Sequence, residues 1–120
     1  MLTGAASIDR DRVVDAMVRV GRAMGDATRA RILLALVAAP QHPSDLADAL
    51  ALTRPNVSNH LACLRGCGLV VAEPEGRRTR YALADRHLAT AIRALTDTVL
   101  AVDAGTTCDD PECLQRGCCA

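Results

Sequence analysis

The chain of 120 residues contains no Phe, no Trp and no Lys, and Tyr81 is its only aromatic residue. Because half of the residues are nevertheless apolar, a hydrophobic core has to be built from aliphatic side chains. The length suits one compact domain with a short appendage. The scarcity of aromatic rings argues against single-stranded nucleic acid as a partner, since such binding usually stacks bases on aromatic side chains.

Long apolar runs are also missing. No stretch approaches the roughly 20 residues that span a bilayer, and no basic start followed by an apolar run marks a signal peptide. We therefore expect a cytoplasmic protein with no membrane partner. In that reducing compartment the six cysteines are expected to be thiols rather than disulfides.

An excess of charge of either sign is absent as well. Fourteen arginines are balanced by fourteen Asp and Glu residues, so the formal net charge is zero. This balance excludes a generally polybasic surface for nucleic acid, but it leaves a local basic patch possible.

Helical signals fill the first half of the chain. Apolar periodicity and end signals such as Gly25 and Pro40 predict four helices, over 9–24, 27–39, 44–50 and 54–67. Short polar residues that favour the N-terminal end of a helix precede or open the last three of them, and the expected caps are Asp26, Ser44 and Thr53.

The pattern then changes to strands. The runs 69–73 and 77–83 are short and strand-like, and Pro74, Glu75 and Gly76 between them indicate a hairpin turn. Asp85 can cap a last helix whose apolar residues continue to Val102. We therefore expect a domain over 1–103, followed by a flexible, cysteine-rich, metal-binding tail over 104–120.

This order of elements predicts a mainly α fold with a β-hairpin wing, a winged helix-turn-helix. The first and last helices carry apolar seams with a spacing close to 3.5 residues, which predicts a homodimer through these two helices. The alternative is that both seams pack inside one monomer. The seam residues are Val13, Met17, Val20 and Met24 in the first helix, and Leu88, Ile92, Leu95, Val99 and Val102 in the last.

The helix over 54–67 has the composition of a helix that reads duplex DNA. Val57, Leu61 and Leu64 form its buried stripe at about 100° per residue, so short polar side chains face the other way. Arginines gather in the hairpin, where they can meet phosphates or the minor groove. The alternative for any one residue is a solvated surface. The candidate DNA-binding residues are Arg54, Asn56, Ser58, Asn59, His60, Arg65, Arg77, Arg78 and Arg80.

Two cysteines lie on this same helix. Cys63 and Cys67 are four residues apart and therefore neighbours on one face, rotated away from the buried stripe. Two thiols make a weak site for a soft metal ion, which usually takes three or four ligands. The tail can supply the rest from Cys108, Cys113, Cys118 and Cys119. The alternatives are ordinary core cysteines on the helix and a redox-active tail.

The segments GDATRARILLAL, SDLADAL, TRPNVSNHLACLRGCGLV and EGRRTRYAL resemble the ArsR/SmtB family of metal-responsive repressors over about residues 10–103. The resemblance is strongest to the cadmium- and lead-sensing branch. It implies a homodimer that binds operator DNA when free of metal. It further implies that the ion is held by Cys63, Cys67 and Cys108, the last from the other protomer.

The two other metal sites of the family are incomplete here. The stretch QHPSDLA lacks the cysteine pair of the arsenic-type site. Asp85 and His87 match half of the zinc-type site, but Thr98 and Ala101 stand where its second pair belongs. Conversely, Cys108 with Cys118 and Cys119 resembles the tail trio of arsenite- and antimonite-responsive members.

We therefore expect a repressor, not an enzyme, with no permanent cofactor and no organic small-molecule substrate. Its effector would be Cd(II) or Pb(II), or else As(III) or Sb(III), and its partners operator DNA and a second copy. One alternative is a winged-helix repressor that senses thiol oxidation. Others are a thiol-based metal carrier and a thiol-dependent reductase, although no cysteine has a convincing activating base beside it.

Overall fold

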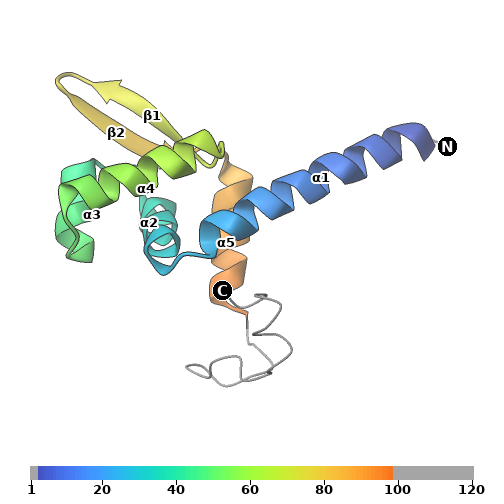
Figure 1. Ribbon diagram of the computed structural model, residues 1–120, viewed down its shortest axis with the longest axis horizontal. Coiled ribbons are helices and arrows are strands. Elements are labelled where there is room, and N and C mark those ends of the chain that lie inside the picture. Colours follow the sequence, from blue (N-terminus) through green and yellow to red (C-terminus); the bar gives the residue numbers. More distant parts are fainter. Residues whose placement is uncertain (1–2, 99–120) are drawn as a thin grey trace.

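A computed structural model describes residues 3–98, with side chains from Asp9 onward. The tail cysteines and the predicted tail region 104–120 lie outside the described residues. The last helix was predicted to continue to Val102, but it ends at Thr96, where the Asp97 N–H bonds back to the carbonyl oxygens of Ala94 and Leu95 as a C-cap. Figure 1 shows the elements in chain order: α1 (Thr3–Met24), α2 (Ala27–Ala38), α3 (Pro43–Leu50), α4 (Arg54–Gly66), β1 (Val70–Glu75), β2 (Arg78–Leu83) and α5 (Arg86–Thr96).

Three of the predicted helix starts are confirmed by their caps. The Asp26 carboxylate accepts a hydrogen bond from the Arg29 N–H at 2.9 Å, and the Thr53 hydroxyl oxygen accepts one from the Asn56 N–H at 3.2 Å. Asp85 caps α5 in the same way. Each cap satisfies an N–H group that has no partner inside the helix.

The predicted cap of the third helix is wrong. The helix α3 begins at Pro43, its N-cap position is His42, and Ser44 lies in the first turn. Proline suits the first helical position because its missing N–H would have no helical partner there. Ser44 is used otherwise, since its hydroxyl oxygen accepts a hydrogen bond from Arg78 of the hairpin at 3.2 Å.

The hairpin turn is shorter than the sequence suggested. The strands pair antiparallel from Val70 opposite Leu83 to Glu75 opposite Arg78, which leaves only Gly76 and Arg77 in the turn. Pro74 and Glu75 therefore lie in β1 and not in the turn, a position that proline tolerates because a two-stranded hairpin has only edge strands. Gly76 has the positive φ of 60° that the first residue of a tight two-residue turn requires.

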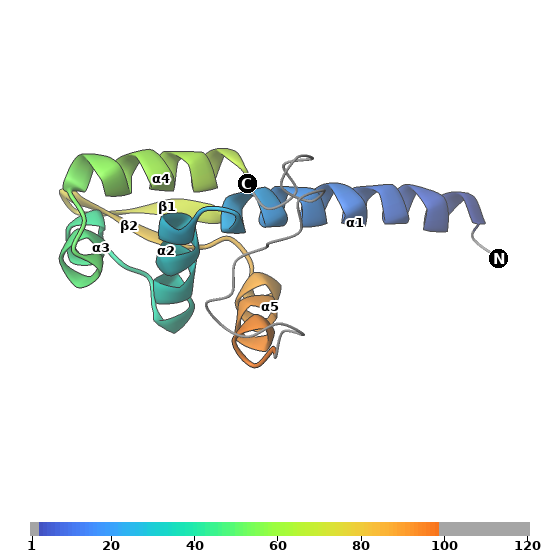
Figure 2. The ribbon, with the colours of Figure 1, turned by 60° about the horizontal axis from the view of Figure 1, so that its bottom comes forward.

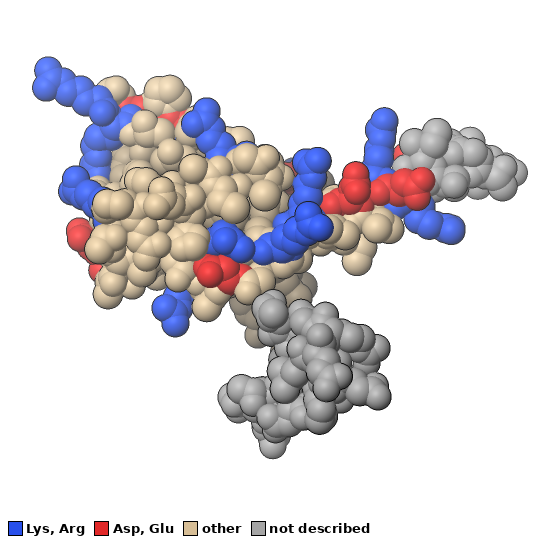
Figure 3. Space-filling model, in the orientation of Figure 1, with Lys and Arg blue, Asp and Glu red and all other residues tan. Residues whose placement is uncertain are grey.

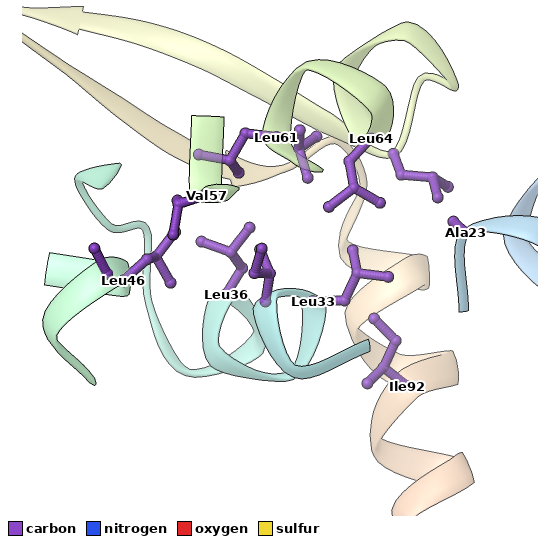
Figure 4. Close-up of a cluster of buried hydrophobic side chains, with 12 residues drawn as sticks. Ala23, Leu33, Leu36, Leu46, Val57, Leu61, Leu64 and Ile92 are labelled. Carbon is purple, nitrogen blue, oxygen red and sulfur yellow. The ribbon is translucent and has the colours of Figure 1, made fainter. Parts of the chain in front are cut away.

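The buried core is aliphatic throughout the described residues and surrounds α2. Helix α2 packs against α1, α3, α4, α5 and β2. Figure 4 shows side chains from all these helices converging between α2 and α4. The predicted buried stripe of α4 is confirmed. The core consists of Ala23, Ile32, Leu33, Leu36, Leu46, Ala47, Val57, Leu61, Leu64, Leu69, Val70 and Ile92.

The two apolar seams are each divided between the core and the surface. In α1, Val20 and Met24 pack against the core, but Met17 is 66% exposed. The N-terminal part of α1 extends away from the body (Figures 1 and 2). In α5, Ile92 is buried and Leu95 is 52% exposed. Packing inside one monomer therefore accounts for only part of each seam.

A helix that spans a membrane must be both long and apolar. Within residues 3–98, no helix is long and apolar enough to cross a bilayer.

Adjacent leucines of α2 test the packing of the core. Leu33 is 1% exposed and Leu34 is 51% exposed. We expect Leu33→Ala to lower the free energy of unfolding by about 2–5 kcal/mol, because it leaves a cavity. Leu34→Ala should change it by only about 0.5 kcal/mol. Urea unfolding at one fixed protein concentration measures both, and equal losses would contradict this core.

The Asp26 cap predicts a pH dependence of stability. The hydrogen bond from the Arg29 backbone and, more weakly, the nearby His60 ring hold the pKa of Asp26 below its ordinary value of 3.8. A lowered pKa means that the ionised carboxylate stabilises the fold above about pH 4 and that this stabilisation is lost as the pH falls. Asp26→Asn keeps a capping side chain without the charge.

The advantage of the wild type over Asp26→Asn in free energy of unfolding should therefore be fully present at about pH 5 and shrink toward about pH 2. Urea titrations across this range measure it. An advantage independent of pH would show that the charge of Asp26 does not contribute.

Candidate DNA interface and thiol pair

Helix α4 presents the predicted polar face to solvent. It lies along one side of the body in Figure 2, and its buried stripe faces α2. Ser58 and Asn59 are exposed, as are Arg54 and Arg65 at its two ends, whereas Asn56 is half-buried. The structure thus brings short polar groups and two cations onto one accessible helix, as a reader of the major groove requires.

His60 differs from the other candidate residues of α4. It is half-buried, and its Nδ1 atom lies 4.0 Å from the carboxylate of Asp26 at the start of α2. At the same corner the Arg29 side chain donates hydrogen bonds to the carbonyl oxygens of Ala23 and Arg22, both at 3.0 Å, and so closes the end of α1. His60 therefore faces the α1–α2 corner inside its own protomer.

The three arginines of the hairpin have three different environments. Arg80 contacts Glu73 at 2.8 Å and Glu75 at 3.5 Å, and the hydrogen bond to Glu73 raises the pKa of its guanidinium further. Arg78 bonds to Ser44, and it lies 3.8 Å from the carboxylate of Asp45. The predicted cationic tip is therefore divided, because two of its three arginines contact other residues of the protein.

Arg77 is the remaining cation of the hairpin. It occupies the turn and is exposed, and no ion pair or side-chain hydrogen bond joins it to another residue within 3–98. Figure 3 shows the basic side chains as separate patches around the body, one of them at the hairpin end. Free positive charge on the wing is therefore concentrated at its turn.

A hollow of about 250 Å³ lies where α3, α4 and the hairpin meet. Two guanidinium groups, those of Arg54 and Arg78, border it from α4 and β2. Ser44 accepts a hydrogen bond from Arg78, which leaves its own O–H free to donate. Such a combination of cations and donors suits an oxyanion. The lining residues are His42, Pro43, Ser44, Arg54, Ser58, Arg78 and Thr79.

The two cysteines of α4 lie at its C-terminal end. Cys63 is exposed, and Cys67 forms the C-cap, where its N–H donates to the Cys63 carbonyl oxygen at 3.0 Å. Both are free thiols, and neither is part of the buried stripe. The predicted displacement from the stripe is therefore confirmed, although Cys67 is half-buried and contacts the edge of the core.

The described residues do not complete a metal site. Within 3–98, no three side chains of His, Cys, Asp or Glu lie close enough together to hold an ion. Asp85 and His87 contact each other at 2.9 Å, but they are an exposed pair at the start of α5. A third thiolate for Cys63 and Cys67 has to come from outside this part of the chain, where Cys108, Cys113, Cys118 and Cys119 are found.

Sequence reasoning missed two arginines beside the thiol pair. Arg12 and Arg19 of α1 line the same hollow as Cys67. Their spacing of seven residues places them on one helix face, which was the only available signal. The sequence does not show that this face lies beside Cys67, because that depends on how α1 packs against the end of α4.

Known proteins that are similar to this chain are bacterial transcriptional regulators. Residues 26–71 match the family described as "Bacterial regulatory protein, arsR family". The transcriptional regulator CmtR of Mycobacterium tuberculosis is 60% identical over 93 residues, which cover 78% of this chain and 79% of CmtR. The transcriptional repressor SmtB of the same organism is 39% identical over 77 residues, or 64% of this chain and 57% of SmtB.

Solved structures show the same fold. The NMR structure of the cadmium metal-sensor CmtR from M. tuberculosis matches with a TM-score of 0.63 and 58% identity, over 78% of this chain and 98% of that one. A homodimeric winged helix-turn-helix DNA-binding domain from Mycobacterium bovis matches with a TM-score of 0.68 and 27% identity, over 73% and 82% of the two chains. The chain belongs to the arsR family of bacterial regulatory proteins, and it is a transcriptional regulator rather than an enzyme.

Proposed function

We propose that two copies of this chain repress transcription by binding operator DNA and release it when a thiophilic ion binds Cys63 and Cys67. The observation that carries the proposal is that the thiols and the polar face belong to one helix, α4. Any ligand that binds both thiols therefore acts directly on the element that reads DNA. The relation to the CmtR cadmium sensor supports this function.

The exposed face of α4 would enter the major groove, where Asn56, Ser58 and Asn59 reach base edges. The hollow between Arg54 and Arg78 would take a backbone phosphate beside that groove, and Arg65 a second one. Arg77 would extend from the turn toward the minor groove. His60 and Arg80, which already face carboxylates, would hold α4 and the wing in position.

A second copy would cover the open parts of the apolar seams. A groove of about 420 Å³ between α1 and α5 is lined by Val13, Ala16, Met17, Val20, Gly21, Leu88 and Ala91. Exposed apolar surface of this kind is typical of an interface. Two-fold symmetry would present two copies of α4 to the half-sites of a palindromic operator. A homodimeric relative of the same fold supports the arrangement.

A thiolate from the tail would complete the coordination of the ion. Cys108 would be the third ligand, and Cys113, Cys118 and Cys119 would be further donors. Thiolates select soft ions, which fits Cd(II) and Pb(II) as well as As(III) and Sb(III). The ion is an effector and not a permanent cofactor. Binding displaces the thiol protons and can weaken DNA binding only as far as the ion prefers the released shape. A coupling of about 3 kcal/mol would lower operator affinity more than a hundredfold.

The phosphate contacts predict a salt-dependent effect. We expect Arg54→Gln and Arg78→Gln each to weaken operator binding and to reduce the slope of log affinity against log salt by about 1. Fluorescence anisotropy at several salt concentrations measures both quantities. Arg86→Gln, at an exposed position of α5 outside the hollow, is the matched control and should keep the wild-type slope. Unchanged slopes in both test variants would contradict the phosphate contacts.

The thiols predict a separation of DNA binding from release. Cys63→Ser and Cys67→Ser should bind the operator as the metal-free wild type does, but addition of Cd(II) should no longer release it. Anisotropy measures release, and thiolate-to-metal absorption measures ion binding. Addition of peroxide in metal-free buffer, followed by a reductant, distinguishes metal sensing from redox sensing. A redox sensor would release the operator on oxidation and bind it again on reduction. Normal metal-driven release by both serine variants would overturn the proposed effector site.

A further inference from the structure

A groove of about 360 Å³ separates α1 from the end of α4, at the half-buried thiol of the proposed effector site. Its floor is apolar and its rim is charged. It differs from the apolar groove between α1 and α5, although Ala16 and Val20 border both. The lining residues are Arg12, Asp15, Ala16, Arg19 and Val20 from α1, followed by Cys67, Gly68 and Leu69.

The rim of this groove carries more positive than negative charge. Arg12 and Arg19 are exposed on one face of α1, with Asp15 between them. No carboxylate oxygen within residues 3–98 lies within 4.0 Å of either guanidinium, and every ion pair of this part of the chain involves other residues. Two unpaired cations beside an apolar floor suit an acidic peptide segment.

The chain itself contains a segment of the required charge. Residues 1–98 hold 13 arginines and 10 acidic residues, a net charge of +3, whereas residues 99–120 hold one arginine and four acidic residues, a net charge of −3. Three of those four acids form a short run, Asp109, Asp110 and Glu112, and this run lies between Cys108 and Cys113. The acidic run therefore adjoins two of the tail thiols in the sequence.

The length of the chain allows this run to reach the groove. The Ala84 N–H donates to the Leu69 carbonyl oxygen at 2.9 Å, so the segment leading into α5 is fastened to the groove floor. Helix α5 has 11 residues, which extend about 16 Å away from that point. The eleven residue-to-residue steps from Thr98 to Asp109 span up to about 36 Å when extended. The run can thus return to the groove of its own protomer.

We propose that the acidic run 109–112 docks on the groove, with its carboxylates paired to Arg12 and Arg19. Docking brings Cys108 and Cys113 next to Cys67 before any ion arrives. It raises the local concentration of the tail thiols at the α4 pair, as a tether does. The consequence for ion binding rests on the proposed effector site, but the docking itself requires no metal.

The first test uses the metal-free, full-length protein. NMR chemical shifts of the backbone amides are compared between the wild type and the variant Asp109→Asn/Asp110→Asn/Glu112→Gln. Shift changes confined to residues 12–19 and 67–69, reproduced in the wild type by high salt, are the expected result, because salt screens exposed pairs. No change at these residues would overturn the proposal. Changes at the Arg77 turn instead would place the run on the wing and also overturn it.

The second test measures Cd(II) affinity by competition with a chelator. Arg12→Gln/Arg19→Gln should weaken Cd(II) binding about three- to tenfold at low salt, as the loss of two exposed ion pairs predicts, and the deficit should vanish at high salt. Arg10→Gln/Arg22→Gln, on the same helix but outside the groove, is the matched control. Equal affinity of test and control variants at every salt concentration would overturn the proposed docking.

A charge swap separates pairing from a general effect of charge. Arg12→Glu/Arg19→Glu combined with Asp109→Arg/Asp110→Arg should restore the affinity that either half of the swap loses. Failure to restore it contradicts a direct pairing. The proposed function fails by a different result, namely metal-driven release that is normal in the Cys63→Ser and Cys67→Ser variants, and that result leaves the NMR test of docking intact.

Discussion

The packing of one apolar stripe of α4 on α2 is the constraint on which the rest of the structure depends. Val57, Leu61 and Leu64 are almost completely buried, and they fix the rotation of α4 about its own axis. Since successive residues are about 100° apart, that rotation also decides what reaches solvent. It exposes Ser58 and Asn59, which are proposed DNA contacts, and Cys63, a proposed ion ligand. One packing contact therefore sets the position of both proposed sites.

Ion pairs within the protein limit the charge that is available to DNA. Arg80 is paired with glutamates of the opposite strand, and Arg78 is fastened to the start of α3. Such exposed pairs contribute little to stability. The pairs of Arg80 join the two strands of the wing, and the contacts of Arg78 join the wing to α3. Arg77 at the turn has no such partner within residues 3–98, and Arg78 still borders the hollow proposed for a phosphate. A protein with no net charge can thus bind a polyanion at one defined place.

Helix α1 connects the proposed dimer interface with the proposed effector site. Its apolar face borders α5, while Arg12 and Arg19 border the hollow beside Cys67. At its C-terminal end, Arg29 closes the helix, and the adjoining Asp26 faces His60 on α4. An ion bound at Cys67 would therefore lie beside α1, and no long pathway would be needed to connect the proposed effector site with the proposed dimer interface.

The sequence by itself determined the order of elements and the family, because caps, periodicity and turn residues act over a few neighbouring positions. Asp26 and Thr53 marked their helices, and the spacing of Val57, Leu61 and Leu64 marked the buried side of α4. Local signals failed where two residue types compete for one role. Pro43 took the start of α3 from Ser44, and pairing in the hairpin drew Pro74 into β1.

Only the tertiary structure decided which side chains meet across elements. No spacing could show that His60 faces Asp26, that Arg78 bonds to Ser44, or that Arg12 and Arg19 border Cys67. These contacts join residues from 34 to 55 positions apart, and they form because core packing fixes the angles between helices. The residue types proposed to bind DNA and soft ions were thus readable in the sequence, whereas their partners within the protein were set by packing.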